Sequence, residues 1–141
     1  MIVMTMKFDT ETIRLMALFE NLTGASVKDC ILDNGVIYIV VDEGEIGVAI
    51  GKNGASVQHA EKKIGKMIKL FEYSKDIAQF VKNLIPQTTD VKIRNENEKV
   101  IVEIRVDKAD RAIVIGRDGK NLKLLKELLQ RNYTVNDLII R

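Results

Sequence analysis

The sequence is short of several residue types, and each shortage excludes a class of protein. Its 141 residues include no tryptophan, one histidine and one cysteine. A single cysteine, Cys30, cannot form an internal disulfide, which fits the reducing environment of the cytoplasm. A single histidine, His59, lacks the partner ligands of a zinc or iron site, and a nucleophilic cysteine would need a basic partner. We therefore expect Cys30 to pack in the interior, His59 to lie on the surface, and no metal or other cofactor.

Long apolar runs are also missing. No run approaches the roughly 18 residues that a membrane span needs. Residues 1–8 are mildly apolar, but they lack the basic lead and long apolar core of a signal peptide. The composition, 46% hydrophobic and 30% charged, is that of an ordinary globular protein. These features predict a cytoplasmic protein with no membrane partner.

The sequence does contain an internal repeat. Residues 48–57 are Val-Ala-Ile-Gly-Lys-Asn-Gly-Ala-Ser-Val, and residues 113–122 are Ile-Val-Ile-Gly-Arg-Asp-Gly-Lys-Asn-Leu. The two copies are offset by 65 positions, from Gly51 to Gly116. A repeat at this spacing indicates two small domains of similar structure. We expect these domains at residues 1–73 and residues 74–141.

Hydrophobic periodicity and turn residues predict one order of elements in both halves: helix, strand, strand, helix, Gly-x-x-Gly, helix, strand. The first helix begins at Asp9 or Thr10 and ends at Gly24, and Ser74 is the expected N-cap of its counterpart. The buried face of the first helix is expected to consist of Leu15, Leu18, Phe19 and Leu22. Strands are expected at residues 27–32, 36–41, 67–71, 91–94, 100–106 and 135–140. We predict an α+β fold in which each half is a three-stranded sheet covered on one face by three helices.

The glycine loops have the properties of a phosphate site. Two glycines three positions apart allow a turn that side chains would obstruct, and they leave the surface bare. The helix after each loop points unpaired N–H groups and a positive dipole end at it, which favours a phosphate. Lys52 and Arg117 add a cation at the same place in both loops, and Lys120 and Lys123 follow the second loop. A structural bend does not need these cations, so we favour contact with a phosphate backbone, although Asp118 offsets Arg117 locally.

Two common nucleotide motifs do not fit the loops. A Walker loop needs four residues between its first glycine and the Gly-Lys pair, whereas Gly47 and Gly51 enclose three. The dinucleotide fingerprint needs a glycine two positions before Gly51 or Gly116, where the sequence has Ala49 and Val114. The sequence therefore gives no support for a nucleotide-using enzyme.

The pattern Ile-Gly-x-x-Gly-x-x-Val/Leu between two helices resembles the KH domain of RNA-binding proteins, and it occurs twice. The leading helix and strand of each half match the type II, prokaryotic arrangement. The stretch Val-Asp-Glu-Gly-Glu-Ile-Gly-Val-Ala-Ile-Gly-Lys-Asn-Gly, followed by Ala-Glu-Lys-Lys-Ile-Gly-Lys and Phe-Glu-Tyr-Ser, is similar to the KH pair of the NusA family of transcription factors. The short archaeal form of that family is the most similar, and the resemblance covers nearly the whole chain.

The resemblance implies a protein that binds single-stranded RNA and is not an enzyme, with each loop clamping the backbone of about four nucleotides. The implied RNA-binding residues are Ile50, Gly51, Lys52, Asn53 and Gly54 in the first half, and Ile115, Gly116, Arg117, Asp118, Gly119, Lys120 and Lys123 in the second. The implied groove floor draws on Ile46, Val48, Ala49 and Ile50, and on Ala112, Ile113, Val114 and Ile115, some of which must face the core instead. An aromatic content of 5% fits such an aliphatic groove better than a sheet that stacks bases on aromatic rings.

The resemblance also implies a role in transcription termination or antitermination. Single-stranded RNA is then the expected partner, RNA polymerase is left open as a second one, and no small-molecule substrate is expected. Residues 1–74 hold 8 Lys and Arg against 10 Asp and Glu, whereas residues 75–141 hold 14 against 10, so the second half attracts polyanions more strongly. The alternative is a KH-fold protein–protein adaptor in a transcription or ribosome-related complex, which would not need Lys52 and Arg117.

Overall fold

A computed structural model of the chain describes residues 9–141, which divide into two compact units between Ser74 and Lys75. The expectation that residues 1–8 are not a signal peptide lies outside the described residues. The first unit contains α1 (Thr10–Thr23), β1 (Val27–Asp33), β2 (Val36–Val41), α2 (Ile46–Ile50), α3 (Ala55–Ile64) and β3 (Met67–Glu72). The second contains α4 (Ile77–Leu84), β4 (Thr88–Glu96), β5 (Lys99–Val106), α5 (Lys108–Ile115), α6 (Lys120–Asn132) and β6 (Asp137–Ile140). The predicted order of elements is confirmed.

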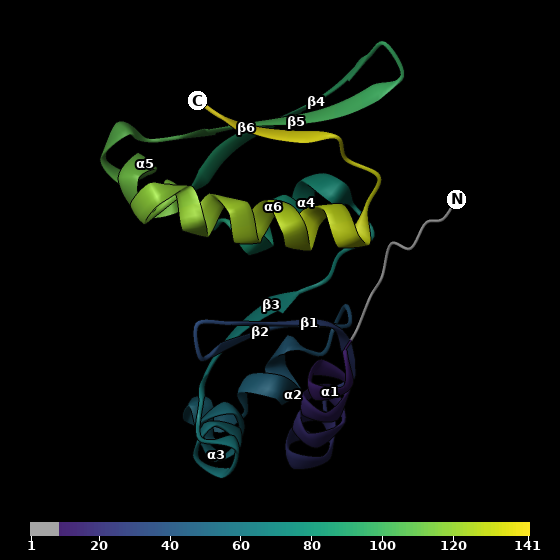
Figure 1. Cartoon of the computed structure of the whole chain (residues 1–141), viewed down its shortest axis with the longest axis vertical. Helices are drawn as coiled ribbons and strands as arrows, with labels where there is room; N and C mark the ends of the chain where they lie inside the picture. The colour runs from purple at the N-terminus through teal and green to yellow at the C-terminus, as the bar shows by residue number, and fades with distance from the viewer. Residues whose placement is uncertain (1–8) are drawn as a thin grey trace. The chain divides into compact units, whose positions relative to one another are not determined.

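Both units have the same sheet topology. The strand orders are β1-β2-β3 and β4-β5-β6, and in each sheet the first pair is antiparallel and the second pair is parallel. Because parallel strands require a crossover, the two helices and the glycine loop connect β2 to β3, and likewise β5 to β6. Figure 1 shows the helices of each unit on one face of its sheet. The predicted α+β fold of two helix-covered, three-stranded sheets is therefore confirmed.

Alternating β-branched residues form the core face of the first sheet. Ile37, Ile39 and Val41 on β2 are fully buried, and Phe19 of α1 packs in the same cluster. Burying an aliphatic or aromatic side chain of this size contributes about 1.5–3 kcal/mol. Cys30 belongs to this cluster and is buried, as expected. The core thus holds α1, α2 and α3 against one face of the sheet.

Several details of the sequence prediction were wrong, and β6 begins at Asp137, two residues after the expected start. The N-cap of α4 is Asp76 rather than Ser74, and its side chain accepts a hydrogen bond from the Ala78 N–H. β4 begins at Thr88, three residues before the expected start, because an irregular register between Thr88 and Asp90 lets this polar segment continue the ladder. Leu18 is 36% exposed, whereas Thr12, Leu15 and Phe19 form the buried stripe of α1.

Candidate functional site

The two glycine loops, residues 51–54 and 116–119, have nearly the same backbone. Gly51 has φ 76° and ψ 173°, and Gly116 has φ 77° and ψ 173°. This region of dihedral space is open to glycine and essentially closed to other residues. Gly54 and Gly119 end the loops in the left-handed region, at φ 78° and 72°. Each loop therefore depends on both of its glycines for its path.

The first glycine of each loop also lets two helices approach closely. A Cβ atom at Gly51 would clash with Ser56 Oγ and lie 2.7 Å from the Ser56 backbone nitrogen. At Gly116 it would lie 2.7 Å from Asn121 Cβ. Asn121 Nδ2 donates a 2.9 Å hydrogen bond to the Val114 carbonyl oxygen, which ties the start of α6 to the end of α5. Sequence reasoning missed Asn121, although its place two residues after Gly119 aligns with Ser56 in the repeat.

The side chains between the glycines face solvent. Asn53 and Asp118 adopt left-handed conformations, with φ 54° and 56°, which Asn and Asp accept more readily than most residues. Lys52 and Arg117 precede them, and all four side chains are exposed. The structure thus presents the predicted cation at the same point of both loops.

The helices that follow the loops add partial positive charge. Their N-cap residues, Gly54 and Gly119, have no side chain that could bond the N–H groups of the first turn of α3 and α6. The N–H groups of Ala55 and Lys120 donate to the carbonyl oxygens of Lys52 and Arg117, and the positive dipole end lies beside the loop, where Lys52 or Arg117 adds a full charge. Such an arrangement can bind an anion such as a phosphate group.

In the first unit, the aliphatic residues of α2, the helix before the loop, divide into exposed and buried ones. Val48 and Ile50 on α2 are 47% and 40% exposed. Ala49 is fully buried, and Ile46 packs against the hydrophobic core. An apolar surface beside the loop is thus formed by Val48 and Ile50, and the other two residues stabilise the fold.

The second unit repeats this division on α5. Ile113 is 67% exposed and Ala112 is also exposed, whereas Val114 is buried. Ile115 is half-buried, so it contributes less surface than Ile50 does in the first unit. A five- to eight-residue helix is too short for sequence periodicity to make this distinction.

The charge around the two loops differs in sign. Residues 43–58 carry one basic and two acidic side chains, a net charge of −1. The equivalent residues 108–123 carry five basic and two acidic side chains, a net charge of +3. Lys120 and Lys123 were expected here, and the exposed Lys108 and Arg111 add to them. Aligning the repeats at the 65-residue offset could have found these two, since they replace Glu43 and Ile46.

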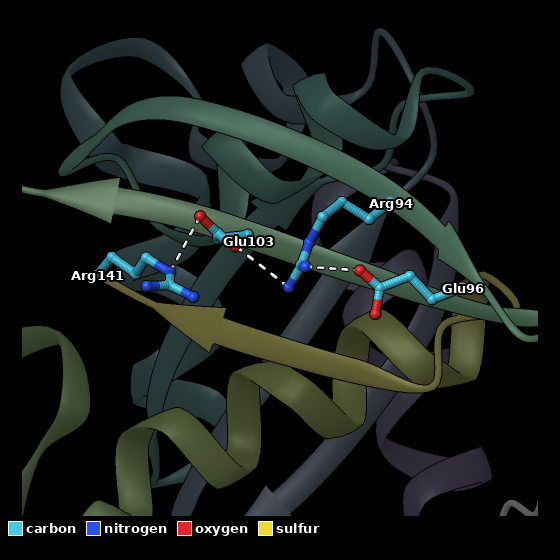
Figure 2. A network of polar contacts seen from close by, with 4 residues as sticks. All are labelled: Arg94, Glu96, Glu103 and Arg141. Atoms are coloured by element: carbon cyan, nitrogen blue, oxygen red, sulfur yellow. Dashed lines mark hydrogen bonds and ion pairs between the residues drawn. The ribbon is translucent and has the colours of Figure 1, made fainter.

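Other cations of the second unit are already paired with acids. Figure 2 shows Arg94 bonded to Glu96 and Glu103, at 2.7 and 3.3 Å, and Arg141 bonded to Glu103 at 3.0 Å. Lys126 lies 2.9 Å from Asp137 on β6, and its hydrogen bond lowers the pKa of that carboxyl group. Within residues 9–141, the structure pairs none of the loop cations Lys52, Arg117, Lys120 and Lys123 with an acidic side chain. The loop cations are therefore available to a polyanion, unlike Arg94, Lys126 and Arg141.

The remaining candidates do not form another site. His59 is exposed on α3, and its equivalent, Leu124, is buried on α6. In the described part of the chain, no group of three His, Cys, Asp or Glu side chains could hold a metal ion. Between Asp9 and Arg141, no helix has both the length and the apolar character to cross a membrane. The predicted site residues of each unit lie on its glycine loop or directly beside it.

Comparison with known proteins agrees with this architecture. A KH-domain family model matches residues 14–86, and a KH-domain model described by KhpA and KhpB matches residues 74–137. The "Probable transcription termination protein NusA" of Methanococcus vannielii is 43% identical over 121 residues, 84% of this chain and 70% of that protein. Its namesake in Halobacterium salinarum is 32% identical over 136 residues, 96% of this chain and 98% of that one. The crystal structure of APE1850 superposes with a TM-score of 0.77 at 33% identity, covering 95% of this chain and all of the other.

Proposed function

This chain belongs to the KH-domain family of NusA-type transcription termination proteins, and on that basis we propose that it binds single-stranded RNA during transcription. It acts as a non-catalytic termination or antitermination factor in the cytoplasm. RNA polymerase is a second partner that this role would require. Each glycine loop grips the sugar–phosphate backbone of a strand, and each unit holds about four nucleotides.

The observation that carries the proposal is the duplicated loop. Two backbones with the same dihedral angles each present an exposed, unpaired cation and an uncapped helix N-terminus. A bend in the chain would need the glycines but neither Lys52 nor Arg117. Phosphate contact needs all of them, because the N–H groups and the cation act on the same negative charge.

The exposed aliphatic residues provide a surface for the bases of the bound strand. Val48 and Ile50 lie on α2 just before the first loop, and Ile113 lies on α5 just before the second. A base whose phosphate is held at the loop can lay its face on these side chains, which removes apolar surface from water. Ile115 serves the same purpose with a smaller exposed area.

An adaptor function is the alternative that these residues oppose. A protein-binding KH fold would need no unpaired cation at the tip of either loop, nor a surface free of side chains there. In the second unit the cations near the loop remain unpaired while Arg94, Lys126 and Arg141 are bonded to acids. This distribution favours a polyanionic partner.

The test reverses the loop charge. In the first loop, Lys52→Asp with Asn53→Asp puts two carboxylates where a phosphate would lie. Asp118 adopts the same backbone conformation as Asn53, so an aspartate is tolerated there. In the second loop, Arg117→Asp has the same effect beside Asp118. We expect the combined variant to lose at least about a hundredfold in affinity for a single-stranded RNA of about ten nucleotides, measured by fluorescence anisotropy.

The control is Lys82→Asp with Lys99→Asp, two exposed lysines that belong neither to the loops nor to the helices beside them. This variant should keep its RNA affinity within about threefold, and circular dichroism should show both variants folded. Unchanged affinity in the combined loop variant would refute the RNA function.

A further inference from the structure

A groove continues from the first loop along α3 to the beginning of β3. It is lined by Gln58, Glu61, Lys62, Gly65, Lys66 and Met67. One end of the groove lies beside the loop, because Gln58 Nε2 is 3.4 Å from the place of a Cβ atom at Gly54. From Gln58 to Lys62 is one turn of α3, so the groove follows the helix axis away from the loop.

The side chains of this groove combine amines with an exposed apolar group. The Glu61 carboxylate is occupied, since it accepts a 2.9 Å hydrogen bond from the Ile68 N–H. Among the described residues, no acidic side chain pairs with Lys62 or Lys66. Met67 is 59% exposed, more than any other large hydrophobic side chain that the structure describes in the first unit. The groove thus offers two cations, an amide and a polarisable apolar side chain.

Helix stability explains only part of this arrangement. Cations in the last turn of a helix interact favourably with its dipole, which accounts for Lys62 and Lys63 at the end of α3. Lys66 lies beyond Gly65, the C-cap, where this effect has ended. The dipole also gives no reason for an exposed methionine beside the lysines.

We propose that this groove, the α3 groove, binds further nucleotides of the RNA strand held by the first loop. The proposal rests on the proposed function. Lys62 and Lys66 contact successive phosphates, and Gln58 links them to the loop. Met67 provides the surface on which a base lies, because its flexible thioether packs well against an aromatic ring.

The second unit does not repeat the two lysines of the α3 groove. At the 65-residue offset, Lys62 corresponds to Glu127 and Lys66 to Arg131. These two residues lie 3.6 Å apart as an ion pair on α6, and α6 continues to Asn132, past the position of Gly65. The α3 groove therefore offers unpaired cations where the second unit has a neutralised helix surface.

The experiment uses the full chain with Arg117→Asp and Lys120→Asp. These substitutions reverse the charge of the second loop, so that RNA binds through the first unit. Into this chain we introduce Lys62→Glu with Lys66→Glu, or the control pair Lys82→Glu with Lys99→Glu, which changes the net charge equally. Two single-stranded RNAs are compared, one of about four nucleotides, which fills the loop site, and one of about eight. Affinity is measured by anisotropy and by NMR of the Met67 methyl group, assigned with Met67→Leu.

We expect the groove variant to bind the longer RNA at least about tenfold more weakly. The slope of its log affinity against log salt should decrease in magnitude by about 1.4, because two phosphate contacts are lost. Its affinity for the shorter RNA should stay within about twofold, and only the longer RNA should shift the Met67 methyl signal. An equal loss in the control variant, or no loss in the groove variant, would overturn the α3 groove as an RNA site. Failure of the proposed function is distinct: the loop variant Lys52→Asp with Asn53→Asp would then bind both RNAs as well as its parent.

Discussion

The first and second loops share a backbone but differ in their surroundings. Their first glycines agree within 1° in φ and have the same ψ, while the net charge of the 16 residues that span the loop changes from −1 in the first unit to +3 in the second. The first unit exposes two large aliphatic side chains before its loop, Val48 and Ile50, whereas the second exposes mainly Ile113. Geometry is therefore the common requirement of the two sites, and charge is the property that separates them.

This difference suggests a division of roles. If the chain binds RNA as proposed, we expect the second unit to attract RNA over distance, because unpaired cations raise the local concentration of a polyanion and speed its association. We expect the first unit to contribute more through neutral contacts and through the α3 groove. An RNA strand that contacts both units would be attracted by the charges of the second and held by the neutral contacts of the first.

The largest expected effect comes from joining the two sites on one strand. Few residues separate β3, which ends at Glu72, from α4, which begins at Ile77, so the second binding event occurs at high effective concentration. We expect an RNA of about ten nucleotides to bind at least about a hundredfold more tightly than one of about four, measured by anisotropy. Equal affinity for the two lengths would mean that the loops hold separate strands.

Exchanging the two residues that follow the loops should remove the charge difference between the sites. Lys120→Ala with Lys123→Gln gives the second loop the residues of the first at those positions, and Ala55→Lys with Gln58→Lys does the opposite. The first pair should lower affinity about tenfold and reduce the magnitude of the slope of log affinity against log salt by about 1.4. The second pair should increase both quantities. If the slopes do not change in opposite directions, the charge difference is not what separates the two sites.

Glycine substitutions should sharpen the comparison by showing where the loops are equal. Alanine at Gly51 or Gly116 must enter a glycine-only region and press against the following helix, so each should lower the free energy of unfolding by about 3 kcal/mol. Alanine at Gly119 meets no atom within 4 Å and should cost about 1–2 kcal/mol for its left-handed backbone. Urea denaturation measures the free energy of unfolding of each variant. A large difference between Gly51→Ala and Gly116→Ala would contradict the structural equivalence of the loops.

The smallest effect is expected from the ion pairs of the second unit. Glu103→Gln removes the ion pair with Arg141 and the longer of the two ion pairs of Arg94. Since both arginine side chains are more than a third exposed, the loss should be at most about 1 kcal/mol and should shrink with added salt. Thermal denaturation at low and high salt checks this, and RNA affinity should change by less than about twofold. A loss of binding would place this network in the RNA path.

The sequence predicted the architecture because its signals were repeated. Two copies of one pattern determined the order of elements, the topology class and the position of both loops. It failed where the signal was local and ambiguous: Ser74 and Asp76 are both good caps, and Thr88 follows Pro86 in a polar stretch typical of a loop. It also could not sort Val48 from Ala49, since α2 has only five residues. The α3 groove depends on the exposure of Met67, which a strand sequence alone does not reveal.

The parallel pairing of β2 with β3 has a consequence for the order in which each unit assembles on the ribosome. The β1–β2 hairpin joins residues three positions apart at its turn, whereas Val36 and its β3 partner, Met67, are 31 positions apart. Local pairs close early and distant pairs close late, because chain entropy opposes long-range contacts. The glycine loop lies inside that long connection, so it acquires its final shape only after β3 has emerged and joined the sheet. We expect the nascent chain to be unable to grip RNA until then, and the first unit to gain that ability before the second is synthesised.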